Sequence, residues 1–486
     1  MFLGIDIGTS SVKAVLVDEH DTPVAQASSQ LSVARPRPGF SEQDPEAWWQ
    51  GTVNAIRSLP SAARAAVRAV GLSGQMHGAT LLDRTDAVLR PAILWNDGRS
   101  ASECLELEHR EPRSRAITGN IMMPGFTAPK LLWVSRHEPE IFARTARVLL
   151  PKDYVRLRLT GEAVSDMSDA AGTGWLDVAQ RDWSDAMLAA TGLERSQMPR
   201  LVEGSAPSGV LTAAMSEQLQ LPRAVVAGGA GDNAASAVGM GIIAPGQSFL
   251  SLGTSGVLFV VTDRFRPNPD KAAHAFCHCL PGRWHQMSVM LSAASALDWV
   301  AQLTGESDLQ RLTEAAQAKG VRAATPYFLP YLSGERTPHN DPHCRGVFFG
   351  LNPETERADL AVAVLEGVAL AFADGMDVLL ETGSAIGEIN VTGGGARITY
   401  WGQLLAAALN RALTYRTGSE IGAALGAARL ARMALTGESP QAVCVLPAIE
   451  RVIDPQPAMV ALLAHRRSIF VRLYRDLKAT FAESAT

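Results

Sequence analysis

The sequence has few aromatic residues and no excess of positive charge. Phe, Trp and Tyr make up 6% of its 486 residues, and 44 Lys and Arg are outnumbered by 49 Asp and Glu, for a formal net charge of −5. This composition lacks the basic field that holds nucleic acid or an anionic membrane, and the stacking platforms that bind single strands. We therefore expect neither nucleic acid nor a membrane as a partner.

The five cysteines are too few and of the wrong parity for a disulfide framework, and are typical of reduced thiols. Residues 1–6 carry no positively charged segment ahead of their apolar residues, so we expect no signal peptide. The longest uncharged stretch, residues 233–262, is long enough to span a bilayer, but it contains Pro245 and several glycines. We interpret it as buried strands and turns and predict a cytoplasmic protein.

An internal repeat is the first informative feature that is present. Residues 7–18 resemble residues 252–263, and each copy contains Gly-Thr-Ser between two apolar runs, which is typical of a β-hairpin. The length also favours two or more domains, since single cores stop growing at about 250–300 residues. We therefore predict a duplicated α/β fold with domains at residues 1–245 and 246–486 and a cleft between them.

Two weaker similarities between the halves of the sequence support the duplication. Residues 70–75 and 389–395 both read as a short strand that runs into a glycine turn. Residues 233–239 and 422–428 are both rich in Ala and Gly. Small residues let helix backbones approach closely, as a hinge between two halves requires, although ordinary tight packing accounts for them equally well.

The repeated turns are candidate phosphate sites. Asp6 ends a strand, Gly8 permits a sharp turn, and Thr9 and Ser10 then offer hydroxyls and backbone N–H groups to an anion. The second copy, residues 253–255, supplies a facing turn, with Ser251 in place of the carboxylate. Asp6 is a candidate Mg²⁺ ligand beside those phosphates. A plain hairpin with a polar turn is the structural alternative.

Asp232 and the glycines at residues 393–395 follow predicted strands. A carboxylate at the carboxyl end of a strand lies where open α/β sheets bind ligands, and can accept a proton from an attacking hydroxyl. Asp232 also suits a helix N-cap. The glycine turn lets adenosine approach the backbone, or is a tight left-handed turn. The sequence contains no G-x-x-x-x-G-K-[ST] segment, which excludes a P-loop.

Two polar segments are candidate sugar contacts. Gln75 and His77 lie beside glycines, and Trp95 opens a second polar loop; for each, a purely structural role remains open. His274, Cys277, His278, Cys279 and His285 look like metal ligands. However, a C-x-C strand places its two sulfurs on the face opposite His278, and zinc sites use longer spacings. We do not expect a metal there.

Two long segments identify the chain as a member of a known family. Residues 125–133, Gly-Phe-Thr-Ala-Pro-Lys-Leu-Leu-Trp, resemble one signature of the FGGY carbohydrate kinases, and residues 346–351, 359–360 and 363–366 resemble the other. The resemblance spans essentially the whole chain. It implies two ribonuclease H-like domains of the actin, hexokinase and Hsp70 superfamily, with the sugar and the base on the first domain and ATP on the second.

Within the family, residues 73–79, 94–99, 123–127, 165–173 and 332–338 are similar to those of members that phosphorylate D-xylulose. The resemblance implies transfer of phosphate from ATP to the 5-hydroxyl of D-xylulose, with Mg²⁺, in pentose catabolism by a homodimer. It implies Asp232 as the catalytic base and Asp6 at the metal. The implied sugar contacts are Met76, His77, Gln75, Asn233 and Trp95. The implied ATP contacts are Thr9, Ser10, Lys13, Gly253, Thr254, Ser255, Gly394, Gly395 and Ala396.

Two other functions remain open: a kinase for another ketose or polyol, and a nucleotide-switch protein on the same fold without sugar turnover. Glycerol kinases carry Arg-Glu where this chain has Met76-His77, so glycerol is not the expected substrate. The chain departs from the family at Ala230, where glycine is usual. We expect this residue to stiffen the loop before Asp232 slightly.

Overall fold

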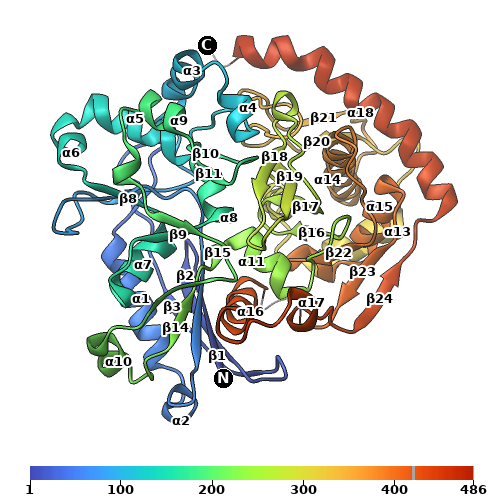
Figure 1. Cartoon of the computed structure of the whole chain (residues 1–486). Coiled ribbons are helices and arrows are strands. Elements are labelled where there is room, and N and C mark those ends of the chain that lie inside the picture. The colour runs from blue at the N-terminus through green and yellow to red at the C-terminus, as the bar shows by residue number, and fades with distance from the viewer. Residues whose placement is uncertain (419–421, 485–486) are drawn as a thin grey trace.

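The structure is a computed structural model that describes residues 1–418 and 422–484. Two seven-stranded mixed sheets form its two halves (Figure 1). The N-terminal sheet runs β13 (Pro207–Val210), β14 (Val225–Ala227), β5 (Ala69–Gly74), β1 (Phe2–Ile7), β2 (Ser11–Val17) and β3 (Pro23–Gln30), with β15 (Ala230–Gly231) also paired to β5. The C-terminal sheet runs β18 (His274–Cys277), β19 (Trp284–Met290), β17 (Gly256–Thr262), β16 (Ser248–Leu252), β22 (Ile389–Thr392), β23 (Leu413–Arg416) and β24 (Ile449–Ile453).

Helices cover these sheets and connect their strands. Those that matter for the site and the core are α1 (Pro45–Arg57), α5 (Thr127–His137), α7 (Pro151–Thr160), α8 (Met167–Ala170), α11 (Asp232–Gly239), α12 (Ala294–Leu303), α14 (Arg357–Leu380), α15 (Thr399–Leu409), α16 (Gly422–Thr436) and α18 (Pro457–Ser484). The Asp44 carboxylate caps α1, as its sequence indicates. The long α14 is almost entirely buried in the C-terminal core, and α18 follows the outer edge of that half (Figure 1).

The predicted duplication is confirmed strand by strand. β1 and β2 form one Gly-Thr-Ser hairpin and β16 and β17 form the other, and each first strand lies parallel to a later strand, β5 or β22. Asp6 pairs with Ser73 across β1 and β5, and Ser251 pairs with Thr392 across β16 and β22. Asp6 and Ser251 therefore occupy equivalent places in the two halves. The boundary at residue 245 itself stays a prediction.

One C-terminal helix does not stay on its own half. α16 packs on β1 and β5 of the N-terminal sheet and on α11, between the two halves (Figure 1). A Cβ on Gly4 would lie 1.9 Å from the carbonyl oxygen of Ala424, and one on Gly71 would lie 1.8 Å from that of Ala427. Such backbone contact is possible only for glycine. The small-residue segments noted in the sequence are thus the two helices, α11 and α16, that cross at the centre of the molecule.

None of the helices in residues 1–418 and 422–484 is both long enough and apolar enough to cross a membrane. In the uncharged stretch 233–262, β16 and β17 with their turns agree with the interpretation as buried strands and turns, whereas residues 233–239 belong to the helix α11 instead.

Candidate active site

Two adjoining chambers lie between the halves. The larger has a volume of about 910 Å³ and the smaller about 280 Å³. Asp232, Asn233 and Ser251 line both chambers. The larger chamber also takes in Asp6, Gly394 and the strand ends of β22 and β23, whereas the smaller takes in Met76, His77 and Trp95. A group transferred between ligands in the two chambers would therefore pass Asp232.

Asp232 is presented by the end of β15, which pairs with the end of β5 beside β1. It is the first residue of α11, and the N-cap is Gly231, so the helix-cap alternative is wrong. One carboxylate oxygen accepts hydrogen bonds from the backbone and side-chain amides of Asn233, at 2.7 and 2.9 Å. Burial, reinforced by the negative charge of Asp6, raises the pKa of Asp232 to about 7. A carboxylate with this proton affinity suits a general base at neutral pH.

Asp6 is a second carboxylate in the larger chamber. Its Oδ1 is buried and has no hydrogen-bond partner among the described residues, and burial raises its pKa. Lys13 pairs with it across the hairpin and also lines the chamber. No group of three or more His, Cys, Asp or Glu in the described residues is placed to hold a metal. Mg²⁺ commonly binds one or two carboxylates together with water and substrate phosphates, so Asp6 fits such an ion.

The two Gly-Thr-Ser turns border the chambers unequally. Gly253 and Ser255 line the smaller chamber. Thr9, Ser10 and Thr254 belong to the same turns but are not among the described residues that line either chamber. The carbonyls of Gly253 and Thr254 accept N–H groups of Ala294 and Ala293 at the start of α12, which fixes the second turn. Asp6 and Gly253 thus border adjoining chambers, as the duplicated turns predict.

The glycine turn after β22 also lines the larger chamber. Gly394 and Ala396 line it, and the described residues leave at least 4 Å of open space where a Cβ on Gly394 would stand. Gly395 is instead buried against Leu252 and Trp401. Arg451, which the sequence did not single out, donates a hydrogen bond to the carbonyl of Ala396 and lies over the Tyr415 ring. Both side chains line the same chamber.

His77 is held rigidly beside the smaller chamber. Its backbone adopts φ of +71°, and its carbonyl accepts hydrogen bonds from the ammonium of Lys130 and the hydroxyl of Thr127, at 2.8 and 3.2 Å. Its Nδ1–H donates to the carbonyl of Gly172 at 2.6 Å. Burial and the charge of Lys130 lower the pKa of His77 well below its usual range. The ring is therefore neutral and presents Nε2 as an acceptor.

Gln75, one of the expected sugar contacts, hydrogen-bonds to neighbouring side chains. It is buried and is not among the described residues that line either chamber. Its amide accepts from the Thr9 hydroxyl at 3.0 Å and donates to Gln43 at 2.9 Å. The Thr9 hydroxyl in turn accepts from the indole N–H of Trp95 at 3.0 Å. Gln75 thus ties the first turn to Trp95, which does line the smaller chamber.

The C-terminal half supplies part of the smaller chamber that the sequence did not reveal. His274, Phe276 and Arg336 line it opposite Met76 and His77. His274 Nδ1–H donates to the Asn120 side chain at 3.2 Å, and burial lowers the pKa of His274 to about 3. A second neutral imidazole therefore faces the same space. In the sequence, His274 stood out only as one of a set of unsuitable metal ligands.

Comparison with known proteins identifies this arrangement. Residues 1–239 match the model of the FGGY family of carbohydrate kinases, N-terminal domain, and residues 249–435 match that of its C-terminal domain. The chain belongs to the FGGY family of carbohydrate kinases. The chambers of this FGGY kinase therefore lie at the junction of the family's two domains.

Several relatives of this FGGY kinase match over their full length. A xylulose kinase from Escherichia coli is 55% identical over 480 residues, covering 98% of this chain and 99% of that protein. A crystal structure of a xylulose kinase from Rhodospirillum rubrum is 32% identical, with a TM-score of 0.91 and 99% of each chain covered. One of a "xyloylose kinase" from Brucella ovis is 51% identical, with a TM-score of 0.95 and the same coverage. A Plasmodium falciparum glycerol kinase, 20% identical with a TM-score of 0.86, shares the fold.

Proposed function

We propose that this FGGY kinase transfers the γ-phosphoryl group of ATP to the 5-hydroxyl of D-xylulose. The observation that carries the proposal is the position of Asp232 on the wall shared by the two chambers. The names of the relatives, which match the whole chain at up to 55% identity, give the sugar. The larger chamber has the volume for a nucleotide and the smaller has that for a pentulose.

The chemistry assigned to the chain is mainly positioning. Asp232 accepts the proton of the 5-hydroxyl as its oxygen attacks the γ-phosphorus and the bond to the β-γ bridging oxygen breaks. His77 accepts a hydrogen bond from a sugar hydroxyl at Nε2, and Arg336 donates from the opposite wall. Gly253 and Ser255, which border the smaller chamber, would contact the transferred phosphoryl group where the two chambers meet, and Lys13 would contact the phosphates from the larger chamber. The open space beside Gly394 would admit adenosine against the backbone.

Asp6 would hold Mg²⁺, directly or through water, since its buried Oδ1 has no partner among the described residues. The bound ion supplies charge neutralisation on the phosphates. Burial raises the pKa of Asp6, and the Ser73 hydroxyl and the charge of Lys13 partly oppose this rise.

Sugar-dependent release of ADP tests the proposal. The purified chain is assayed with ATP and Mg²⁺ against D-xylulose, D-ribulose, gluconate and glycerol, with each substrate varied separately. We expect D-xylulose to give the highest kcat/KM by at least about tenfold, because the walls are built for one arrangement of hydroxyls. A higher kcat/KM for another ketose or polyol would replace the substrate and keep the reaction. ADP release without dependence on any sugar would favour a nucleotide switch. The homodimer and the cytoplasmic location stay predictions.

A further inference from the structure

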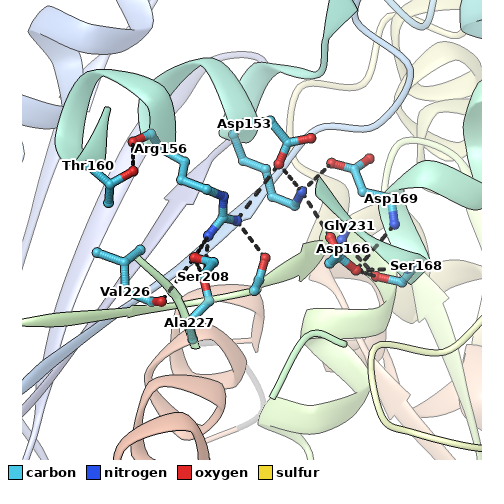
Figure 2. Close-up of polar contacts among 12 residues, drawn as sticks. Asp153, Arg156, Thr160, Asp166, Ser168, Asp169, Ser208, Val226, Ala227 and Gly231 are labelled. Atoms are coloured by element: carbon cyan, nitrogen blue, oxygen red, sulfur yellow. Dashed lines mark hydrogen bonds and ion pairs between the residues drawn. The ribbon is translucent and has the colours of Figure 1, made fainter. Parts of the chain in front are cut away.

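A cluster of charged side chains is enclosed directly behind the loop that carries Asp232. Its members, all fully buried, are Lys152, Asp153 and Arg156 of α7 together with Asp166 and Asp169 at the start of α8. Figure 2 labels the three carboxylates and Arg156. The Lys152 ammonium lies 2.6 Å from Asp153, 2.9 Å from Asp166 and 3.0 Å from Asp169. The cluster lines neither chamber among the described residues, so it has no assigned part in binding or catalysis.

The cluster contacts both ends of the loop. Where the chain leaves β14, the guanidinium of Arg156 donates to the carbonyl oxygens of Ala227 and Gly228 at 2.5 Å. Just before Asp232, the backbone N–H of Gly231 donates to the hydroxyl of Ser168 at 3.1 Å. That hydroxyl is itself oriented by donating to Asp166 at 2.5 Å (Figure 2). The loop is therefore anchored at its first and last residues by side chains that the ion pairs hold in place.

The rest of the loop has no room to adjust. A Cβ on Gly228 would lie 2.2 Å from the carbonyl oxygen of Glu203, and one on Gly229, where φ is +76°, would lie 2.2 Å from that of Leu72. On the sugar side, a Cβ on Gly231 would lie 2.9 Å from the Met76 side chain. The methyl group of Ala230 is fully buried as well. The loop is therefore closely packed on both sides, and a shift of its backbone at Gly231 would move the neighbouring Asp232.

The energetics of buried charges indicate that this cluster orients the backbone rather than stabilises the fold. Moving charged groups out of water costs several kcal/mol per ion, and apolar replacements of buried ion pairs are often neutral or stabilising. What such a cluster provides is hydrogen bonds of fixed direction, here aimed at the backbone at both ends of the loop that precedes Asp232. Catalytic groups lose about a hundredfold in rate for displacements near 1 Å.

We propose that Ser168 and Arg156 are positioning residues for Asp232, acting through the backbone of residues 227–231; this rests on the proposed function of Asp232 as the base. Neither side chain touches the substrates. Ser168 sets the position of Gly231, and Arg156 sets the point where the loop begins.

Ser168→Ala is the sharper test, because replacement of Arg156 would leave three buried carboxylates opposite a single lysine and threatens the fold. The variant loses one hydroxyl and no charge. We expect kcat to fall about 10- to 100-fold while KM for xylulose and for ATP stays within about twofold, since the binding walls remain in place. Ser165→Ala is the matched control: Ser165 is equally buried on the neighbouring strand, and its hydroxyl has no hydrogen-bond partner among the described residues.

A double variant distinguishes the positioning of Asp232 from an unrelated loss of activity. If Ser168 acts only through Asp232, adding Ser168→Ala to Asp232→Asn should leave the residual rate of Asp232→Asn unchanged within about twofold, because non-additivity marks residues that act as a unit. Equal kcat for Ser168→Ala and Ser165→Ala would overturn the proposal. So would a loss of kcat accompanied by a proportional rise in both KM values, or a full additive loss in the double variant.

The result can be told apart from a failure of the proposed function. If the unaltered chain turns over no sugar, the assigned reaction fails before any variant is compared. If it prefers another sugar, the same variants are compared with that sugar, since Ser168 and Arg156 act on the base and not on the sugar. If Asp232→Asn keeps most of its kcat, the assignment of the base fails, and with it the premise that Ser168 and Arg156 position a base.

Discussion

Asp232 is the residue on which the chemistry depends, and one nearly isosteric change tests it. Because Asp232 does not cap its helix, Asp232→Asn tests the carboxylate alone. Loss of a general base costs about 10²–10⁴-fold in rate, so we expect that fall in kcat with both KM values nearly unchanged. A variant that keeps most of its kcat would contradict the assignment.

Stability of the same variant gives an independent readout. The pKa of Asp232 is raised to about 7 by burial and by Asp6, so ionisation of this carboxylate weakens the folded state as pH rises toward that value. Asn cannot ionise. The melting temperature of Asp232→Asn in the absence of ligands should therefore equal or exceed that of the unaltered chain at about pH 8.

His77 should act on the sugar and not on the nucleotide. Removal of its Nε2 acceptor leaves a buried sugar hydroxyl without a partner, at a cost of about 1–3 kcal/mol. We expect His77→Ala to raise KM for xylulose about tenfold or more and to leave KM for ATP within about twofold. His109→Ala, at an exposed position on α3 (Ala101–Arg110), serves as the control. Unchanged xylulose kinetics would return His77 to a structural role.

Glu335 makes stability depend on pH in a predictable direction. Burial raises its pKa to about 8; one oxygen accepts the N–H groups of Leu291 and Arg336, and the other has no partner among the described residues. A raised pKa contributes stability that is complete below the unfolded value and is lost as pH rises through the folded value. Glu335→Gln keeps the accepting oxygen but cannot ionise. Its melting temperature should match that of the unaltered chain at about pH 4 and exceed it at about pH 9. Parallel curves would contradict this.

At the residue scale, the sequence predicted site residues that directly follow a strand. It missed residues that reach the site only through tertiary packing. Asp6, Asp232 and the glycine turns end strands, and the edge where parallel strands end gathers such residues. His274 and Arg336 reach the smaller chamber from a strand and a loop of the other half. No local pattern specifies which face of that strand meets a distant chamber. The hydrogen bonds of Gln75 to Thr9 and Gln43 could not be foreseen either, because its polarity suits a sugar hydroxyl and a neighbouring side chain equally well.

At the element scale, α11 and α16 cross with their backbones in close contact. A Cβ on Gly426 would lie 1.8 Å from the carbonyl oxygen of Ala235, so the backbones must separate to admit it. We expect Gly426→Ala to destabilise the protein by about 3 kcal/mol or more in urea unfolding. Gly51→Ala in α1 is the matched control, because its Cβ would meet only side-chain methyls of Val12 and Leu31 at 3.0 and 3.2 Å. Equal effects of the two changes would contradict the close contact.

The sequence predicted individual elements better than it predicted which elements pack against each other. The two Gly-Thr-Ser hairpins depend on local spacing, and the structure confirms both of them. The placement of α16 on the N-terminal sheet depends on a contact across more than half the chain. The matching glycines, Gly4 and Gly71, lie in strands, where glycine can equally mark a bulge or a bend.

At the scale of the whole molecule, the smaller chamber should couple the two halves. Met76 and His77 come from the first half, and Gly253, His274 and Arg336 from the second. A ligand that binds only the folded form at about 100 times its Kd adds about 2.7 kcal/mol of stability. We therefore expect xylulose alone, without ATP, to slow amide hydrogen exchange in β5 and β18 alike. In His77→Ala, xylulose should protect both β5 and β18 less against hydrogen exchange. Protection confined to residues 1–245 would contradict a chamber shared by the halves.

The helix α16 has a consequence for how the gene can be divided. It covers an apolar patch on the first sheet formed by Phe2, Val15, Val17 and Ala69. A fragment ending at residue 245 would leave that patch open to water and to other chains, whereas the complementary fragment would carry an unsupported Ala- and Gly-rich helix. The two repeats, although each has its own sheet, therefore form an interlocked pair. Their fragments should be recovered in active form by co-expression as a split enzyme, and not by separate production.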